Sequence, residues 1–147
     1  MIQRIQTVYL VISTILLGLL FLIPFAEIAV DGIIYLFNYK GISADGTLKY
    51  NGYALSILIG VLVILHAVII LNYKNRIRQI RFLVLSILLM LGLFGMFFFF
   101  THYTFGNASV SYKVSVFFPL IAVILDYLAI RAIGKDEALI RSIDRIR

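Results

Sequence analysis

The sequence lacks cysteine altogether, and this absence excludes several kinds of chemistry. A chain without thiols cannot form disulfides, iron–sulfur clusters, cysteine-based zinc sites or a thiolate nucleophile. Charge is also scarce, because 14% of the 147 residues are charged, whereas a soluble domain has about 25%. Apolar residues make up 63% of the chain, and the mean hydropathy is +1.06. This composition excludes intrinsic disorder and a water-soluble domain, and it predicts a membrane protein.

Proline is nearly absent as well, and the two prolines, Pro24 and Pro119, lie near the ends of long apolar runs. Four such runs cover residues 8–26, 54–72, 82–101 and 114–133. Each run is long enough to cross a hydrocarbon core as a helix, which needs about 20 residues. Lipid cannot satisfy free backbone groups, so each run should be helical. We therefore expect an all-α membrane protein, in which residues 1–147 form one domain with a bundle of four transmembrane helices.

The two loops on one side of this bundle, residues 27–53 and 102–113, contain short strand signals. Residues 33–40 have strand-like composition, Asp45-Gly46 is a hairpin-turn dipeptide, and residues 47–50 follow it as a returning strand. Residues 109–112 alternate in polarity and offer a third strand. We predict a small extracytoplasmic β-hairpin, or a sheet of two or three strands, that covers one end of the bundle.

Positive charge gathers on the opposite side of the predicted bundle. The N-terminal tail, the loop at 73–81 and the C-terminal segment together hold Arg4, Lys74, Arg76, Arg78, Arg81, Arg131, Lys135, Arg141, Arg145 and Arg147. The other two loops hold only Lys40, Lys49 and Lys113. Because Lys and Arg are enriched in cytoplasmic loops, we expect both termini in the cytoplasm. The net charge of +6 is then a signal of topology and does not indicate a nucleic-acid partner.

The C-terminal tail, residues 134–147, is expected to form an amphipathic cytoplasmic helix. Its apolar residues recur at helical spacing, and Glu137 precedes Arg141 by one helical turn. Such a helix can lie on the lipid surface or dock on a partner protein. The candidate docking residues are Lys135, Asp136, Glu137, Arg141, Asp144, Arg145 and Arg147.

Asp126 is the only acidic residue inside a predicted span, and an acid within a membrane is a candidate functional group. Arg131 lies on the same helix at an awkward angle for pairing, so Arg4 or Arg81 on neighbouring helices are better partners. We favour a structural ion pair between helices. A proton or ion site is the alternative, although a transporter usually gathers more polar groups near the membrane midplane.

His66 lies in the second span, with no histidine or acid one turn away on either side. A metal site is therefore poorly supported, and a hydrogen bond to a neighbouring helix is the favoured interpretation. Proton sensing stays open, because an imidazole changes its charge near neutral pH. We find no catalytic constellation, metal site or cofactor motif, and the sequence does not indicate an enzyme. The basic loop at residues 74–81 also suits anionic headgroups or RNA, but membrane topology accounts for it.

Four stretches of sequence resemble a known family. They are residues 1–10 (MIQRIQTVYL), residues 75–81 (NRIRQIR), and the C-terminal pair 128–133 (LAIRAI) and 135–147 (KDEALIRSIDRIR). The chain is similar throughout to a family of uncharacterised bacterial four-helix inner-membrane proteins of comparable length, classed as a domain of unknown function. This resemblance implies topology, bacterial origin and the inner membrane, and it implies no activity.

Together these features favour a small non-enzymatic membrane protein that is an accessory subunit of a larger complex, such as a protein-export or envelope-assembly machine. Its expected partners are the lipid bilayer and other membrane subunits, with no bound nucleic acid, small-molecule substrate or cofactor. The alternative is a homo-oligomeric proton or ion transporter, or a channel, that uses Asp126 and His66. A claudin-like or tetraspanin-like organiser rests on architecture alone, and the absence of cysteine counts against it.

Overall fold

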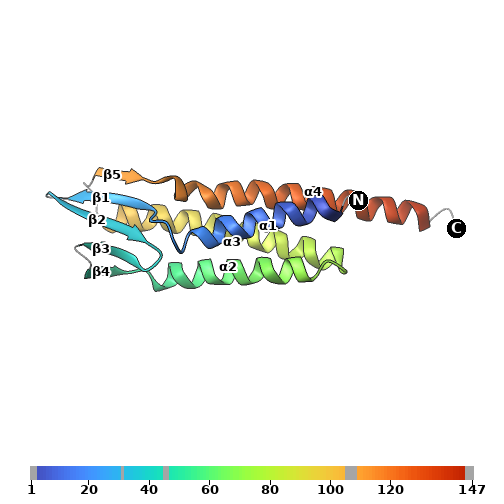
Figure 1. Cartoon of the computed structure of the whole chain (residues 1–147), viewed down its shortest axis with the longest axis horizontal. Coiled ribbons are helices and arrows are strands. Elements are labelled where there is room, and N and C mark those ends of the chain that lie inside the picture. The colour runs from blue at the N-terminus through green and yellow to red at the C-terminus, as the bar shows by residue number, and fades with distance from the viewer. Residues whose placement is uncertain (1–2, 31, 45–46, 105–108, 145–147) are drawn as a thin grey trace.

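The computed structural model describes residues 3–30, 32–44, 47–104 and 109–144. Figure 1 shows an elongated molecule in which helices run along the length and a β-sheet lies at one end. The helices are α1 (Gln3–Leu19), α2 (Tyr53–Leu71), α3 (Arg76–Thr104) and α4 (Phe118–Asp144), and the 3-10 helix η1 (Val114–Phe117) precedes α4. Each helix packs against the next in chain order, and α4 closes the ring by packing against α1.

Among the described residues, three helical segments are long and apolar enough to cross a membrane: Tyr53–Leu71, Arg76–His102 and Val114–Ile140. Helix α1 is also apolar but is shorter, at 17 residues. The outward faces of the helices are apolar, as on α2, where Ile57, Ile64 and Leu71 are 66–76% exposed. Large exposed aliphatic side chains at helical spacing are suited to contact with lipid. The chain is therefore a membrane protein.

The sheet contains five antiparallel strands, in the spatial order β4-β3-β2-β1-β5. They are β1 (Ala26–Val30), β2 (Ile33–Asn38), β3 (Gly41–Ala44), β4 (Thr47–Asn51) and β5 (Ser109–Tyr112). Four strands come from the segment between α1 and α2, whereas β5 comes from the segment between α3 and α4. Strand β5 pairs with β1, with Ala26 opposite Tyr112, and so the sheet ties the two connecting segments together.

The expected fold class, an all-α bundle of four transmembrane helices with a small extracytoplasmic hairpin or sheet, is wrong. The fold is mixed, because a five-stranded sheet is an integral part of it. Strand β1 begins at the last residue of the apolar run at 8–26, which looks like helix by hydropathy alone. The expected returning strand at 47–50 pairs with β3 and not with β2. The Asp45-Gly46 turn lies outside the described residues, whereas residues 109–112 do form a strand.

The sheet shares one hydrophobic core with the ends of the helices, and this explains why it is integral. Phe25 before β1, Phe37 on β2 and Phe97 on α3 are almost completely buried. The Phe25 and Phe37 rings meet edge to face with centroids 5.3 Å apart, and the Phe25 and Phe97 centroids are 4.6 Å apart. Aromatic pairs at these separations contribute about 0.5–1.5 kcal/mol beyond area burial. The inner face of the sheet is thus fixed to the bundle.

Two glycines allow the sheet to join α2 closely. Gly41, at the start of β3, has φ +125°, a backbone conformation that side chains rarely tolerate. A Cβ atom at this position would lie 2.1 Å from the Tyr50 carbonyl oxygen and 2.6 Å from the Gly52 nitrogen. The Gly52 N–H donates to the Lys40 carbonyl at 2.8 Å, just before α2 begins. Because neither glycine has a side chain, the backbones at Gly41 and Gly52 can approach closely, and this approach sets the direction in which α2 leaves the sheet.

Candidate functional site

Four buried polar side chains meet inside the helix bundle, and each helix contributes one of them. They are Ser13 on α1, His66 on α2, Ser86 on α3 and Asp126 on α4, and all four are 0% exposed. We call this group the polar cluster. Each member occupies the buried stripe of its helix, as on α2, where the buried residues are Leu55, Ile59, Leu62, His66 and Ile69. The same helical periodicity that builds the apolar core therefore also brings these polar groups together.

The centre of the polar cluster is the contact between His66 and Asp126. His66 Nε2 lies 3.1 Å from Asp126 Oδ2 and 3.2 Å from Asp126 Oδ1. Ser86 Oγ donates to Asp126 Oδ2 at 2.8 Å, and Ser13 Oγ lies 3.1 Å from His66 Nε2. With the contact of His66 Nδ1 described next, each nitrogen and oxygen of the two ionisable side chains has a partner, as a buried polar group requires.

The His66 ring is held at both of its nitrogens. Its Nδ1 lies 2.9 Å from the Leu62 carbonyl oxygen, and a carbonyl only accepts, so Nδ1 is the donor in this contact. Its Nε2 faces the Asp126 carboxyl group. A proton between these two groups, on either side, would leave the pair electrically neutral, which lowers the cost of burying it within a bundle.

The polar cluster is closed in this conformation, because none of its side chains reaches the surface. Its donor set contains one imidazole and one carboxylate. Within the described part of the chain, no three His, Cys, Asp or Glu side chains gather as metal ligands. The arrangement can therefore hold the four helices in register through a contact between an imidazole and a carboxyl group.

The sequence indicated Asp126 and His66 separately, and the structure brings them together. Arg81 and Arg131, which were considered as partners of Asp126, are exposed, whereas Asp126 is fully buried. The side chain of Arg4 lies outside the described part of the structure. Ser13 and Ser86 were not singled out by the sequence analysis. Their only signal is a small polar residue on an otherwise apolar buried stripe, and serine is common in membrane helices.

The candidate docking residues on α4 have different environments. Lys135 is exposed, whereas Asp136 is 8% exposed and its Oδ2 accepts from Gln6 Nε2 at 2.7 Å. Asp136 therefore joins α4 to α1 and is not on the surface. Glu137 faces Arg76 at the start of α3, with 3.8 Å between Oε2 and Nη1. The side chains of Arg141 and Asp144, and the whole of Arg145 and Arg147, lie outside the described residues.

Comparison with known proteins assigns the chain to a family. A family model described as "Domain of unknown function (DUF4293)" matches residues 2–146. No curated protein and no solved structure matches the chain.

Proposed function

The chain belongs to the DUF4293 family, and we propose that this member is a non-enzymatic accessory subunit of a larger membrane complex. Its bundle is the membrane anchor, the polar cluster holds the four helices together, and the free end of α4 contacts the partner. A machine for protein export or envelope assembly is a suitable host. One observation carries the proposal, namely the extension of α4 beyond the rest of the bundle.

Helix α4 is longer than a membrane crossing requires. Its 27 residues correspond to about 40 Å at 1.5 Å per residue, whereas a hydrocarbon core is about 30 Å thick. Figure 1 shows its C-terminal end extending beyond the ends of the other three helices. Leu139 and Ile140, near this end, are 54% and 42% exposed. An exposed apolar pair near the end of α4 supports contact with another protein.

We place the protein in the bacterial inner membrane, and its charge distribution supports an orientation with both termini in the cytoplasm. The sheet end of the molecule carries Lys40, Lys49 and Lys113, whereas the opposite end carries most of the remaining Lys and Arg residues. Positive residues are retained on the cytoplasmic side during insertion. In this placement α1 is the first of four passes, since it packs along α4 within the same bundle.

The test is purification of the protein from its native membranes in mild detergent, followed by mass spectrometry of the bound proteins. We expect a stoichiometric membrane partner with the wild type. The double variant Leu139→Ser/Ile140→Ser should reduce its recovery about tenfold, the loss that corresponds to about 1.4 kcal/mol at an interface. The charge reversal Arg141→Glu/Arg145→Glu should also abolish association while membrane insertion is retained.

A matched control lies at the other end of the molecule. Ile34 and Leu36 on β2 are also exposed apolar residues, at 63% and 42%. The variant Ile34→Ser/Leu36→Ser should keep the partner. A pure homo-oligomer from native membranes, or wild-type partner recovery in both α4 variants, would overturn the proposal.

A second candidate function, proton-coupled transport, is favoured by the contact between His66 and Asp126. His66 Nε2 lies 3.1 Å from Asp126 Oδ2 inside the bundle, and paired groups of this kind occur as proton relays in transporters. Transport would require the closed polar cluster to open. Purified protein in liposomes should then conduct protons, and Asp126→Asn should stay folded and lose the flux. A subunit without transport activity should give no flux in the wild type, and Asp126→Asn should affect mainly its assembly.

A further inference from the structure

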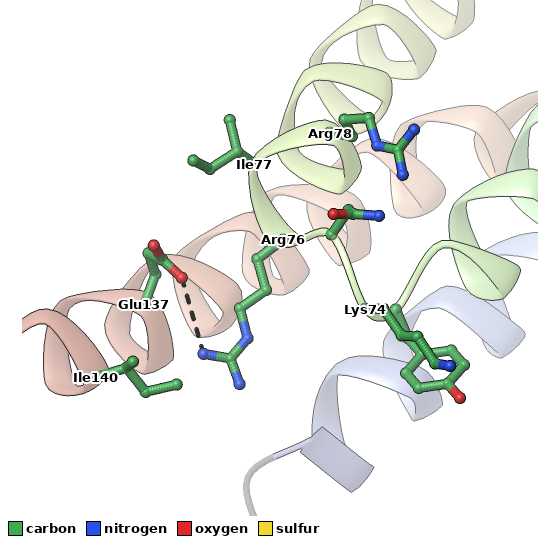
Figure 2. Close-up of a pocket in the computed structure, with 8 residues that line it drawn as sticks. Lys74, Arg76, Ile77, Arg78, Glu137 and Ile140 are labelled. Atoms are coloured by element: carbon green, nitrogen blue, oxygen red, sulfur yellow. Dashed lines mark ion pairs between the residues drawn. The ribbon is translucent and has the colours of Figure 1, made fainter.

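A pocket of about 530 Å³ lies at the end of the molecule opposite the sheet, between the α2–α3 connection and α4. Three cationic residues, Lys74, Arg76 and Arg78, line it, together with one acid, Glu137. We call it the basic pocket. Figure 2 shows the Arg76 side chain extending from the start of α3 toward Glu137 on α4. The excess of positive charge points to an anionic ligand.

The guanidinium group of Arg76 has hydrogen-bonding capacity that the described protein leaves unused. Its Nη1 atom is buried and has no hydrogen-bond partner among the described residues. The 3.8 Å separation from Glu137 Oε2 allows electrostatic attraction but exceeds hydrogen-bond distance. A buried donor without an acceptor is costly, and phosphate oxygens match the planar fork of a guanidinium group. A phosphate group that takes the place of Glu137 beside Arg76 would supply the missing acceptor.

The backbone at the start of α3 adds to this preference. Helix α3 begins at Arg76 and has no acidic residue in its first turn. The first N–H groups of a helix lack partners within the helix, and the positive end of its dipole favours an anion. The unused Arg76 donor, the surrounding cations and the end of α3 therefore favour the same ligand charge.

The surroundings of the basic pocket indicate where the phosphate comes from. Leu71 at the end of α2 is 76% exposed, Tyr73 is 57% exposed and Ile77 is 48% exposed. Exposed apolar and aromatic residues next to cations at the end of a membrane helix are typical of the headgroup level. We propose that the basic pocket binds the phosphate group of an anionic phospholipid headgroup. This proposal requires the membrane placement and is independent of any partner protein.

The test uses the full-length protein in mild detergent, titrated with phosphatidylglycerol or phosphatidylcholine, with bound lipids counted by native mass spectrometry. The wild type should bind phosphatidylglycerol in preference to phosphatidylcholine. Arg76→Gln should weaken phosphatidylglycerol binding about tenfold, the change expected from loss of one good charge-assisted hydrogen bond. Arg76→Lys keeps the charge and should restore only part of the affinity, since a lysine lacks the guanidinium fork.

The matched control is Arg81→Gln/Arg131→Gln, which removes exposed cations that do not line the basic pocket. It should leave phosphatidylglycerol binding unchanged. An equal loss in this control would mean that diffuse charge attracts the lipid, and the proposal would then be wrong. Glu137→Gln provides a second variant if Arg76→Gln does not fold. It removes a competing carboxylate and should strengthen phosphatidylglycerol binding, so an unchanged affinity would also count against the pocket.

A competition with inorganic phosphate separates the two sources of the ligand. Millimolar phosphate should displace little phosphatidylglycerol if the acyl chains and neighbouring apolar residues contribute to binding. Complete displacement, with phosphate itself protecting the wild type but not Arg76→Gln against thermal unfolding, would assign the pocket to a free anion. That outcome would overturn the lipid proposal.

Discussion

The polar cluster and the basic pocket are two polar centres of the same molecule, and their hydrogen bonding differs. In the polar cluster all four side chains are fully buried, and the histidine and carboxylate atoms lie within 3.2 Å of their partners. In the basic pocket, the Arg76 and Glu137 side chains are 20% and 28% exposed and 3.8 Å apart, and a buried guanidinium nitrogen has no hydrogen-bond partner among the described residues. A satisfied and closed centre holds helices together, whereas an unsatisfied and open one has capacity for a ligand.

The largest expected effect is the loss of one member of the central pair. Asp126→Leu leaves His66 buried without its main partner, and breaking a buried pair in this way costs about 3–5 kcal/mol. The free energy of unfolding in mixed detergent micelles should fall by this amount. The double variant His66→Leu/Asp126→Leu should recover most of it, because replacement of a whole buried pair by apolar residues is often neutral. A double variant as unstable as Asp126→Leu would show that pairing is not what the polar cluster contributes.

The Gln6–Asp136 contact should give an intermediate effect and sharpen the comparison. It lies on α1 and α4, at the charged end of the molecule, yet it is nearly as buried as the polar cluster, with 7% and 8% exposure. Gln6→Leu removes the donor at 2.7 Å from the carboxylate, and a hydrogen bond to a charged group contributes about 1.5–3 kcal/mol.

The measurement for this pair is again unfolding in mixed micelles, with Asp136→Asn as the control. The control keeps a hydrogen-bonding side chain and should cost less than Gln6→Leu. If Gln6→Leu were as stable as the wild type, burial and hydrogen bonding would not predict how much each site contributes to the free energy of unfolding. The distinction between satisfied and unsatisfied polar centres would then be wrong.

Hydropathy located a helix in each of the four apolar runs, but the first run, 8–26, is helical only as far as Leu19. It was not sufficient for the sheet. Helix α1 ends at Leu19 and strand β1 begins at Ala26 within the same apolar run, and the residue before β1, Phe25, is held by contacts with β2 and α3. The pairing of β5 with β1 joins residues more than eighty positions apart, such as Ala26 and Tyr112, and local composition carries no information about it.

In the candidate site, too, the sequence identified single residues but not the contacts between residues that are far apart in the chain. Asp126 and His66 stood out because each is an ionisable residue within an apolar run. Their contact could not be derived, since it depends on how far α2 and α4 are shifted and rotated relative to each other. Arginine was considered as the partner of Asp126 because of its charge and its expected place at the ends of neighbouring helices. In the structure the buried stripe of α2 presents His66 at the same level, whereas Arg81 and Arg131 lie on exposed faces.

The smallest expected effect concerns the basic pocket. Arg76→Gln in lipid-free detergent should change the free energy of unfolding by no more than about 1 kcal/mol, as for partly exposed ion pairs. The reason is that Nη1 makes no hydrogen bond with the described residues, so little is lost with it. Added phosphatidylglycerol should stabilise the wild type by mass action, by about 2.7 kcal/mol at one hundred times the dissociation constant, and should stabilise Arg76→Gln much less. Arg81→Gln should behave as the wild type in both conditions. A cost of several kcal/mol for Arg76→Gln without lipid would instead place the Arg76–Glu137 pair with the polar cluster, as a structural contact.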